Sequence, residues 1–167
     1  LRIGRFKHIY EVARGFRNEG MDANHLQDFT MVEGYSAYWN YEDNMKFMKE
    51  MITYILKKLY DGNLNIQIGD KVIDFGGEWK VVSFRELILK DCGIDIDKFE
   101  TAESLLAEIK KQKIDLEAEN IESLGRGNLI DQLYKKVSRP SIIEPTFLIK
   151  HPIDLSPLAR SNDENSN

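Results

Sequence analysis

Cysteine is nearly absent from this sequence, and long apolar runs are absent altogether. Cys92 is the one cysteine among 167 residues, so no disulfide can form within the chain, and a lone thiol lacks the partner spacing of a metal site. No run approaches the roughly 20 apolar residues that cross a bilayer, and the opening LRIGRFKHIY has no apolar stretch of the signal-peptide type. We expect an unexported, cytoplasmic protein without a membrane partner.

An excess of positive charge is also missing. Lysine and arginine together number 23 against 28 acidic residues, which gives a net charge of −5. This balance argues against broad binding of a phosphate backbone, so any nucleic-acid contact would be local or supplied elsewhere. The hydrophobic share of 42% and the charged share of 31% are typical of a globular protein, and the length is that of one domain.

The first half of the chain predicts two strands, a helix and a hairpin. Residues 9–19 and 29–39 are rich in aromatic and β-branched side chains, and the polar loop between them is too long for a tight turn, so they should be antiparallel neighbours. Asn40 can cap a helix that stops near Asp61-Gly62 and has a buried apolar stripe. The members of that stripe are Met45, Met48, Ile52, Ile55 and Leu59.

The second half predicts helices between short strands. Residues 65–75 alternate around a Gly-Asp turn, as in a hairpin, and Ser83 can cap a short helix that Gly93 closes. Residues 101–138 have helical patterns and suggest a helical insertion at about 94–140, packed on the sheet. Residues 141–155 are β-prone, and Pro145 and Pro152 interrupt them, which fits an edge strand or the ends of a strand. Together these elements predict an α+β fold over 1–167, a mainly antiparallel sheet flanked by helices.

The two N-terminal strands carry an unusual set of side chains. Alternation places Ala13, Gly15 and Arg17 on one face of the first strand. On the second strand, one face carries Phe29, Met31, Glu33 and Tyr35. If these faces coincide, one sheet surface surrounds a glycine-alanine clearing that a ligand could occupy. The larger side chains on that surface would be Arg17, Glu19, Phe29, Glu33 and Tyr35, with His25 in the loop.

These residue types suit a phosphate-bearing ligand with a flat base. A guanidinium binds phosphate oxygens as a planar fork, a phenylalanine ring stacks on a base, and a loop histidine can donate to a phosphate. Carboxylates would repel a triphosphate, so Glu33 should face a cation and Glu19 a donor such as an exocyclic amine. The plainer alternative is a surface ion pair between Arg17 and Glu19, a solvated His25 and half-buried strand residues.

The segment FRNEG, followed by a histidine, FTMVE and a tyrosine, resembles motif 2 of the class II aminoacyl-tRNA synthetases. It is most similar to the lysyl-tRNA synthetase version of that motif. The downstream EPTFLIKHPIDLSPLARSND is similar to the same family's stretch that ends in SPLAR, and the two matches occur in the correct order. The resemblance covers residues 5–92 and 140–165, and it implies a partial class II catalytic core.

The resemblance also implies a role for each candidate residue. Arg17 would be catalytic and would grip the α-phosphate of ATP. The other residues that would bind ATP are Glu19 at the adenine side, His25 at the outer phosphates and Phe29 stacked on adenine. The ε-ammonium of lysine would bind Glu33, with Tyr35 beside it.

For the complete enzyme, the resemblance implies lysine and tRNA(Lys) as substrates, a homodimer, and Mg²⁺ held by residues outside this chain. Because motifs 1 and 3 are missing, we expect the 167-residue piece to be inactive by itself. The alternatives are a synthetase-like paralogue that serves as an ATP or amino-acid binding module, and one that attaches lysine to a protein.

Overall fold

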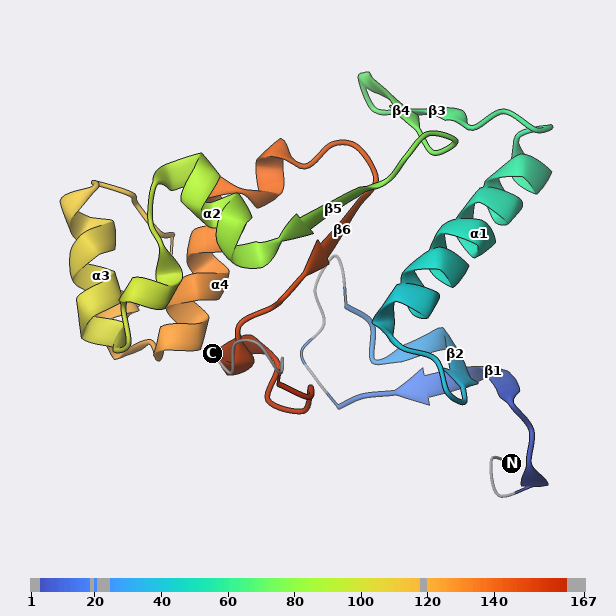
Figure 1. Ribbon diagram of the computed structural model, residues 1–167, viewed down its shortest axis with the longest axis horizontal. Coiled ribbons are helices and arrows are strands. Elements are labelled where there is room, and N and C mark those ends of the chain that lie inside the picture. The colour runs from blue at the N-terminus through green and yellow to red at the C-terminus, as the bar shows by residue number, and fades with distance from the viewer. Residues whose placement is uncertain (1–3, 19, 21–24, 118–119, 162–167) are drawn as a thin grey trace. The chain divides into compact units, whose positions relative to one another are not determined.

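The computed structural model describes residues 4–18, 20, 25–117 and 120–161 (Figure 1). The chain divides into two compact units, Leu1–Met48 and Lys49–Asn167. That both belong to one catalytic domain stays a prediction. None of the helices among the described residues is long and apolar enough to cross a membrane.

The first unit is built on one antiparallel ladder. Strands β1 (His8–Phe16) and β2 (Asp28–Ser36) pair along their whole length, which confirms the predicted neighbours. Both strands end about three residues before the predicted limits. Backbone hydrogen bonds from Arg17 N to Gln27 O (2.9 Å) and from Ala37 N to Lys7 O (2.8 Å) extend the ladder by one residue pair at each end.

Helix α1 (Tyr41–Leu59) follows β2 and begins where the sequence predicts. The backbone N–H of Asp43 donates to Asn40 Oδ1 (2.9 Å), and the Asn40 N–H donates to the Asp43 carboxylate (3.0 Å), so the first turn is capped reciprocally. The predicted buried stripe is wrong for this chain, because no residue of α1 is buried. Its apolar side chains have the expected helical spacing, but no described residue covers them fully.

The described residues of the second unit form two further strand pairs. Strands β3 (Asn65–Ile68) and β4 (Lys71–Asp74) form the predicted antiparallel hairpin, in which Gly69 adopts a left-handed φ of 59°. Strands β5 (Lys80–Ser83) and β6 (Thr146–Ile149) pair in parallel. The described strands therefore form three separate pairs, two antiparallel and one parallel, which together with the helices is consistent with the predicted α+β class. That they belong to one mainly antiparallel sheet stays a prediction. A parallel pair needs a long crossover, and the helices supply it.

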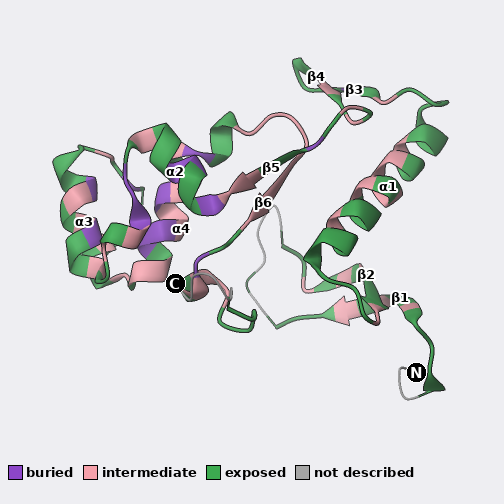
Figure 2. Ribbon diagram, viewed as in Figure 1, coloured by how far each residue is buried: buried purple, intermediate pink, exposed green. Residues whose placement is uncertain are grey.

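Three helices enclose the hydrophobic core of the second unit, as the concentration of buried residues on them shows (Figure 2). They are α2 (Phe84–Cys92), α3 (Ala102–Lys111) and α4 (Arg126–Val137). Ser83 caps α2 through its side chain, and Gly93 closes it at φ 75°, both as predicted. The segment 101–138 is helical as expected, and it forms the core together with α2. That this segment is an insertion stays a prediction. The fully buried members include Phe84, Ile88, Leu105, Ile109, Leu129, Ile130 and Leu133.

Arg126, at the start of α4, ties three segments of this unit together. Its Nε donates to the carbonyl of Phe99 at 2.7 Å, and its Nη2 donates to the carbonyl of Ile96 at 3.0 Å. Its Nη1 forms an ion pair with Asp154 in the turn Ile153–Leu155. The next residue, Gly127, lies so close to Asp154 that a Cβ atom would be 2.9 Å from its carbonyl oxygen. This contact fixes the segment that follows β6 against the helices.

Replacing Gly127 with alanine should therefore destabilise the second unit. The new methyl group would meet backbone, which cannot move aside as a flexible side chain can, and overpacking of this kind costs about 1–3 kcal/mol. Urea denaturation of the protein measures the change in unfolding free energy. The matched control is Asn128→Ala, at the adjacent exposed position of the same helix. Equal stability of the two variants would contradict the close approach.

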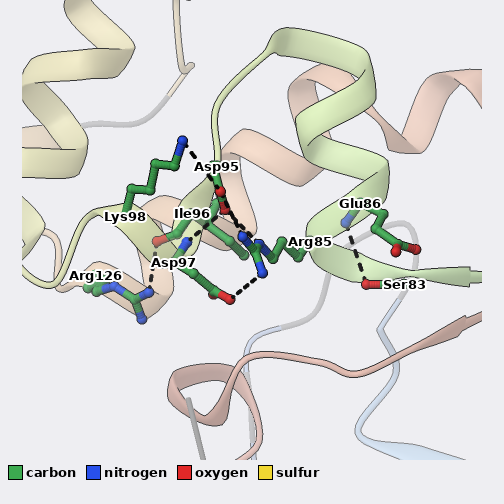
Figure 3. Close-up of polar contacts among 8 residues, drawn as sticks. All are labelled: Ser83, Arg85, Glu86, Asp95, Ile96, Asp97, Lys98 and Arg126. Carbon is green, nitrogen blue, oxygen red and sulfur yellow. Dashed lines mark hydrogen bonds and ion pairs between the residues drawn. The ribbon is translucent and has the colours of Figure 1, made fainter. Parts of the chain in front are cut away.

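Asp95 is the centre of a second polar cluster (Figure 3). Its two carboxylate oxygens accept hydrogen bonds from Nε and Nη2 of Arg85 at 2.6 and 2.7 Å, so the pair is bidentate. Asp97 lies 3.2 Å from the third guanidinium nitrogen. The hydrogen bonds from Arg85 hold the pKa of Asp95 below its ordinary value of 3.8, although Asp95 is only 7% exposed. The cluster fastens the turn after α2 to the start of that helix.

The contribution of Asp95 to stability should depend on pH. Because the folded pKa is lowered, the stabilisation is complete above pH 3.8 and is lost as the pH falls through the lowered value. At neutral pH, Asp95→Asn should cost about 1–2 kcal/mol, a modest figure because the Arg85 side chain is 44% exposed. Urea denaturation at neutral pH and at roughly pH 3 should show the difference from wild type shrinking in acid. The exposed Asp91→Asn variant is the control, and a difference that is constant with pH would refute the assignment.

Candidate functional site

The register of β1 and β2 places most of the predicted site residues on one face of the ladder. Directly opposed residues of an antiparallel pair share a face. Gly15 pairs with Phe29, Ala13 with Met31, and Ile9 with Tyr35. Glu33 falls in the same alternate set, and Arg17 continues it one step beyond the end of β1. The other face carries the exposed apolar side chains Tyr10, Val12, Phe16 and Val32.

One end of this face combines a cation with an aromatic ring. The guanidinium carbon of Arg17 lies over the Phe29 ring, 5.6 Å from its centroid, within the range of a cation–π contact. Arg17 is exposed and Phe29 is half-buried. The backbone hydrogen bond from Arg17 to Gln27 holds the start of this side chain at the edge of the ladder. A guanidinium and a ring are thus available side by side for an anion and a flat group.

The other end of the face is acidic. The hydroxyl of Tyr35 donates a hydrogen bond to Glu33 Oε2 at 3.2 Å. The negative charge of Glu33, followed by this hydrogen bond, raises the pKa of Tyr35 above its ordinary value of 10.0. Glu33 and Tyr35 are both exposed. An exposed carboxylate oriented by a tyrosine is a suitable acceptor for an ammonium group.

Glu11 belongs to this acidic end and was not among the residues predicted from the sequence. It pairs directly with Glu33 across the ladder, so two carboxylates share one face. Like charges directly opposite each other destabilise a strand pair. The alternation that places Ala13 and Gly15 on this face reaches Glu11 two residues earlier, and this signal could have identified it.

The two ends are far enough apart to hold different parts of a ligand or two ligands. Phe29 and Glu33 are four residues apart on one extended strand, which corresponds to about 13 Å. The stretch between them is flanked by the small residues Ala13 and Gly15. An anion with a flat base at the Arg17 end and a cation at the Glu33 end would then lie along the same strands.

The other two candidates are placed less completely. His25 is exposed, before the start of β2, and it has an interaction within the structure. Glu19 lies outside the described residues. Among the residues that the structure describes, no group of three or more histidines, cysteines and acids could hold a metal ion. The catalytic and binding roles of all six candidates stay predictions.

Comparison with known proteins gives the family. The family model described as tRNA synthetases class II (D, K and N) matches residues 1–167, and the chain belongs to this family. Its relatives include the lysine–tRNA ligase of Dehalococcoides mccartyi, 36% identical over 97% of this chain and 32% of the relative. The lysine–tRNA ligase of Aquifex aeolicus is 37% identical over 97% of this chain and 26% of its own length.

A third relative is the lysine–tRNA ligase of Prochlorococcus marinus, 37% identical over 98% of this chain and 31% of the relative. The chain spans about a third of the length of the curated relatives that it matches. The resemblance on which the sequence analysis relied is therefore confirmed at the level of the family.

The contact between Glu33 and Tyr35 predicts a measurable change in titration. In the Glu33→Gln variant, the pKa of Tyr35 should fall toward 10.0, because the neighbouring charge that disfavours the phenolate is removed. NMR titration of ring-labelled tyrosine measures the pKa, and Tyr35→Phe identifies the signal. Glu50→Gln, at an exposed position of α1, serves as the control. An unchanged Tyr35 pKa in Glu33→Gln would show that the two side chains do not interact.

Proposed function

We propose that this chain is part of an enzyme that activates lysine with ATP and transfers it to tRNA(Lys). The observation that carries the proposal is the strand register, which puts Arg17, Phe29 and Glu33 on one face of the β1–β2 ladder. A cationic amino acid needs an acid, and a nucleotide needs a guanidinium and a ring. Membership in the class II tRNA synthetase family and relatives named lysine–tRNA ligase support this choice of substrates.

In the proposed reaction, the adenine of ATP stacks on Phe29 and the α-phosphate lies at Arg17. The ε-ammonium of lysine binds Glu33, which leaves the lysine carboxylate pointing along the strands toward the phosphate. A carboxylate oxygen attacks the α-phosphorus, the bond to the β-phosphate breaks, and pyrophosphate leaves. Lysyl-adenylate remains, and a hydroxyl of the tRNA then attacks its carbonyl carbon and releases AMP.

The protein contributes positioning and charge stabilisation in this scheme. Arg17 stabilises the negative charge that builds on the α-phosphate oxygens in the transition state. Tyr35 orients the Glu33 carboxylate through its hydrogen bond. His25 would bind the outer phosphates, and Glu19 the exocyclic amine of adenine. ATP is expected to bind with Mg²⁺, and the described residues contain no cluster of three or more histidines, cysteines and acids that could hold that ion. We propose a homodimer for the complete enzyme.

Lysine-dependent exchange of pyrophosphate into ATP by the full-length protein tests the proposal. Glu33→Gln should raise the KM for lysine about a hundredfold, since an ammonium bound without its counter-charge loses about 3 kcal/mol. The KM for ATP should change little. Glu50→Gln is the control because Glu50 is exposed on α1.

Three results would count against this assignment. Absence of lysine-dependent exchange in the wild-type protein would remove the proposed activity. An equal rise in both KM values in Glu33→Gln would make Glu33 structural. If the protein exchanges pyrophosphate into ATP but attaches lysine to a protein and not to tRNA(Lys), the lysine acceptor is a protein instead of an RNA.

A further inference from the structure

Phe29 occupies the space that a side chain at position 15 would fill. Gly15 and Phe29 are directly paired across the ladder. A Cβ atom built on Gly15 would lie 2.9 Å from Cε2 and 3.1 Å from Cζ of the Phe29 ring. Both distances are shorter than ordinary van der Waals contact, so the ring rests on the bare backbone of β1.

Space, and not backbone conformation, is what requires glycine at this position. The glycines with left-handed φ values among the described residues are Gly62, Gly69 and Gly93. Gly15 lies within a regular strand and is not among them. An alanine could adopt its backbone angles, but it would push the Phe29 ring away from the strand.

We infer that Gly15 is a positioning residue for the nucleotide: by having no side chain, it sets the height and tilt of the Phe29 ring on which the base stacks. This inference rests on the proposed function, in which Phe29 is the stacking surface. The ring also lies next to the Arg17 guanidinium. Its position therefore sets the spacing between the plane of the base and the group that grips the phosphate.

A purely structural role makes a different prediction. A phenylalanine that covers a glycine on the facing strand can stabilise a ladder by shielding its backbone. In that case a methyl group at position 15 would change stability, or affect both substrates alike. The atoms nearest to the new methyl are at the far end of a side chain that can rotate. Displacement of the ring should therefore cost little stability while it moves the stacking plane.

The test is Gly15→Ala in the full-length protein, with three binding readouts. The KM for ATP in pyrophosphate exchange should rise about tenfold, because stacking of a base on an aromatic ring contributes substantially to its binding. The KM for lysine should stay within about twofold, since lysine does not touch the ring. Inhibition by inorganic tripolyphosphate, which has phosphates but no base, should be unchanged.

Gly34→Ala is the matched control. Gly34 pairs with Tyr10 and so faces the other side of the same ladder. Among the residues that the structure describes, a Cβ there would have only the carbonyl oxygen of Ile9 within 4 Å, at 3.9 Å. This variant should keep both KM values and the melting temperature of the wild type.

A double variant tests whether Gly15 acts through the Phe29 ring. Phe29→Leu alone should raise the KM for ATP, because the flat ring is lost. Adding Gly15→Ala to Phe29→Leu should then cause no further rise, since the ring through which Gly15 acts is gone. Independent, additive effects would overturn the inference.

Other outcomes distinguish failure of the Gly15 inference from failure of the proposed function. An unchanged KM for ATP in Gly15→Ala, or a parallel rise for ATP, lysine and tripolyphosphate together with a lower melting temperature, would overturn the inference. If the wild-type protein shows no lysine-dependent exchange, the proposed function fails instead. Calorimetric titration with ATP and with tripolyphosphate then still compares Gly15→Ala with wild type, and equal loss for both ligands would refute the role of Gly15.

Discussion

The register between β1 and β2 is the constraint on which the candidate site depends. A shift of one residue between two strands turns alternate side chains to the opposite face. Arg17 and Glu33 would then no longer lie on the same side. Backbone hydrogen bonds beyond both ends of the ladder, from Arg17 to Gln27 and from Ala37 to Lys7, hold the register where it is. The main-chain pairing therefore determines which side chains share this face.

The second unit relies on a different device, in which arginine side chains bind carbonyls and carboxylates from distant segments. Arg85 holds the turn after α2 through Asp95, and Arg126 joins that same turn to the segment after β6. Charge-assisted hydrogen bonds of this type are directional. They therefore specify one arrangement of these segments, whereas a hydrophobic core alone would permit several arrangements. The helices pack through the hydrophobic core, and Arg85 and Arg126 hold the segments that connect them.

Local signals in the sequence predicted most elements and the face shared by the site residues. Ser83 and Gly93 mark the ends of α2 because capping depends on neighbouring residues only, and alternation alone assigned Phe29 and Glu33 to one face. The parallel pairing of β5 with β6 could not be predicted in this way, since it joins residues far apart in sequence. The contact between Gly15 and the Phe29 ring was also out of reach, because it depends on a rotamer that no local pattern specifies.

The pairing of β5 with β6 has a consequence for the order in which the second unit folds. Lys80 aligns with Thr146, more than sixty residues later in the chain. Bringing such distant ends together costs loop-closure entropy, which four paired residues per strand cannot offset alone. Collapse of α2, α3 and α4 shortens the intervening path first, so the helices should condense early and the strands should meet last. The segment that leaves β6 would then reach its final place only after the rest of the unit has formed.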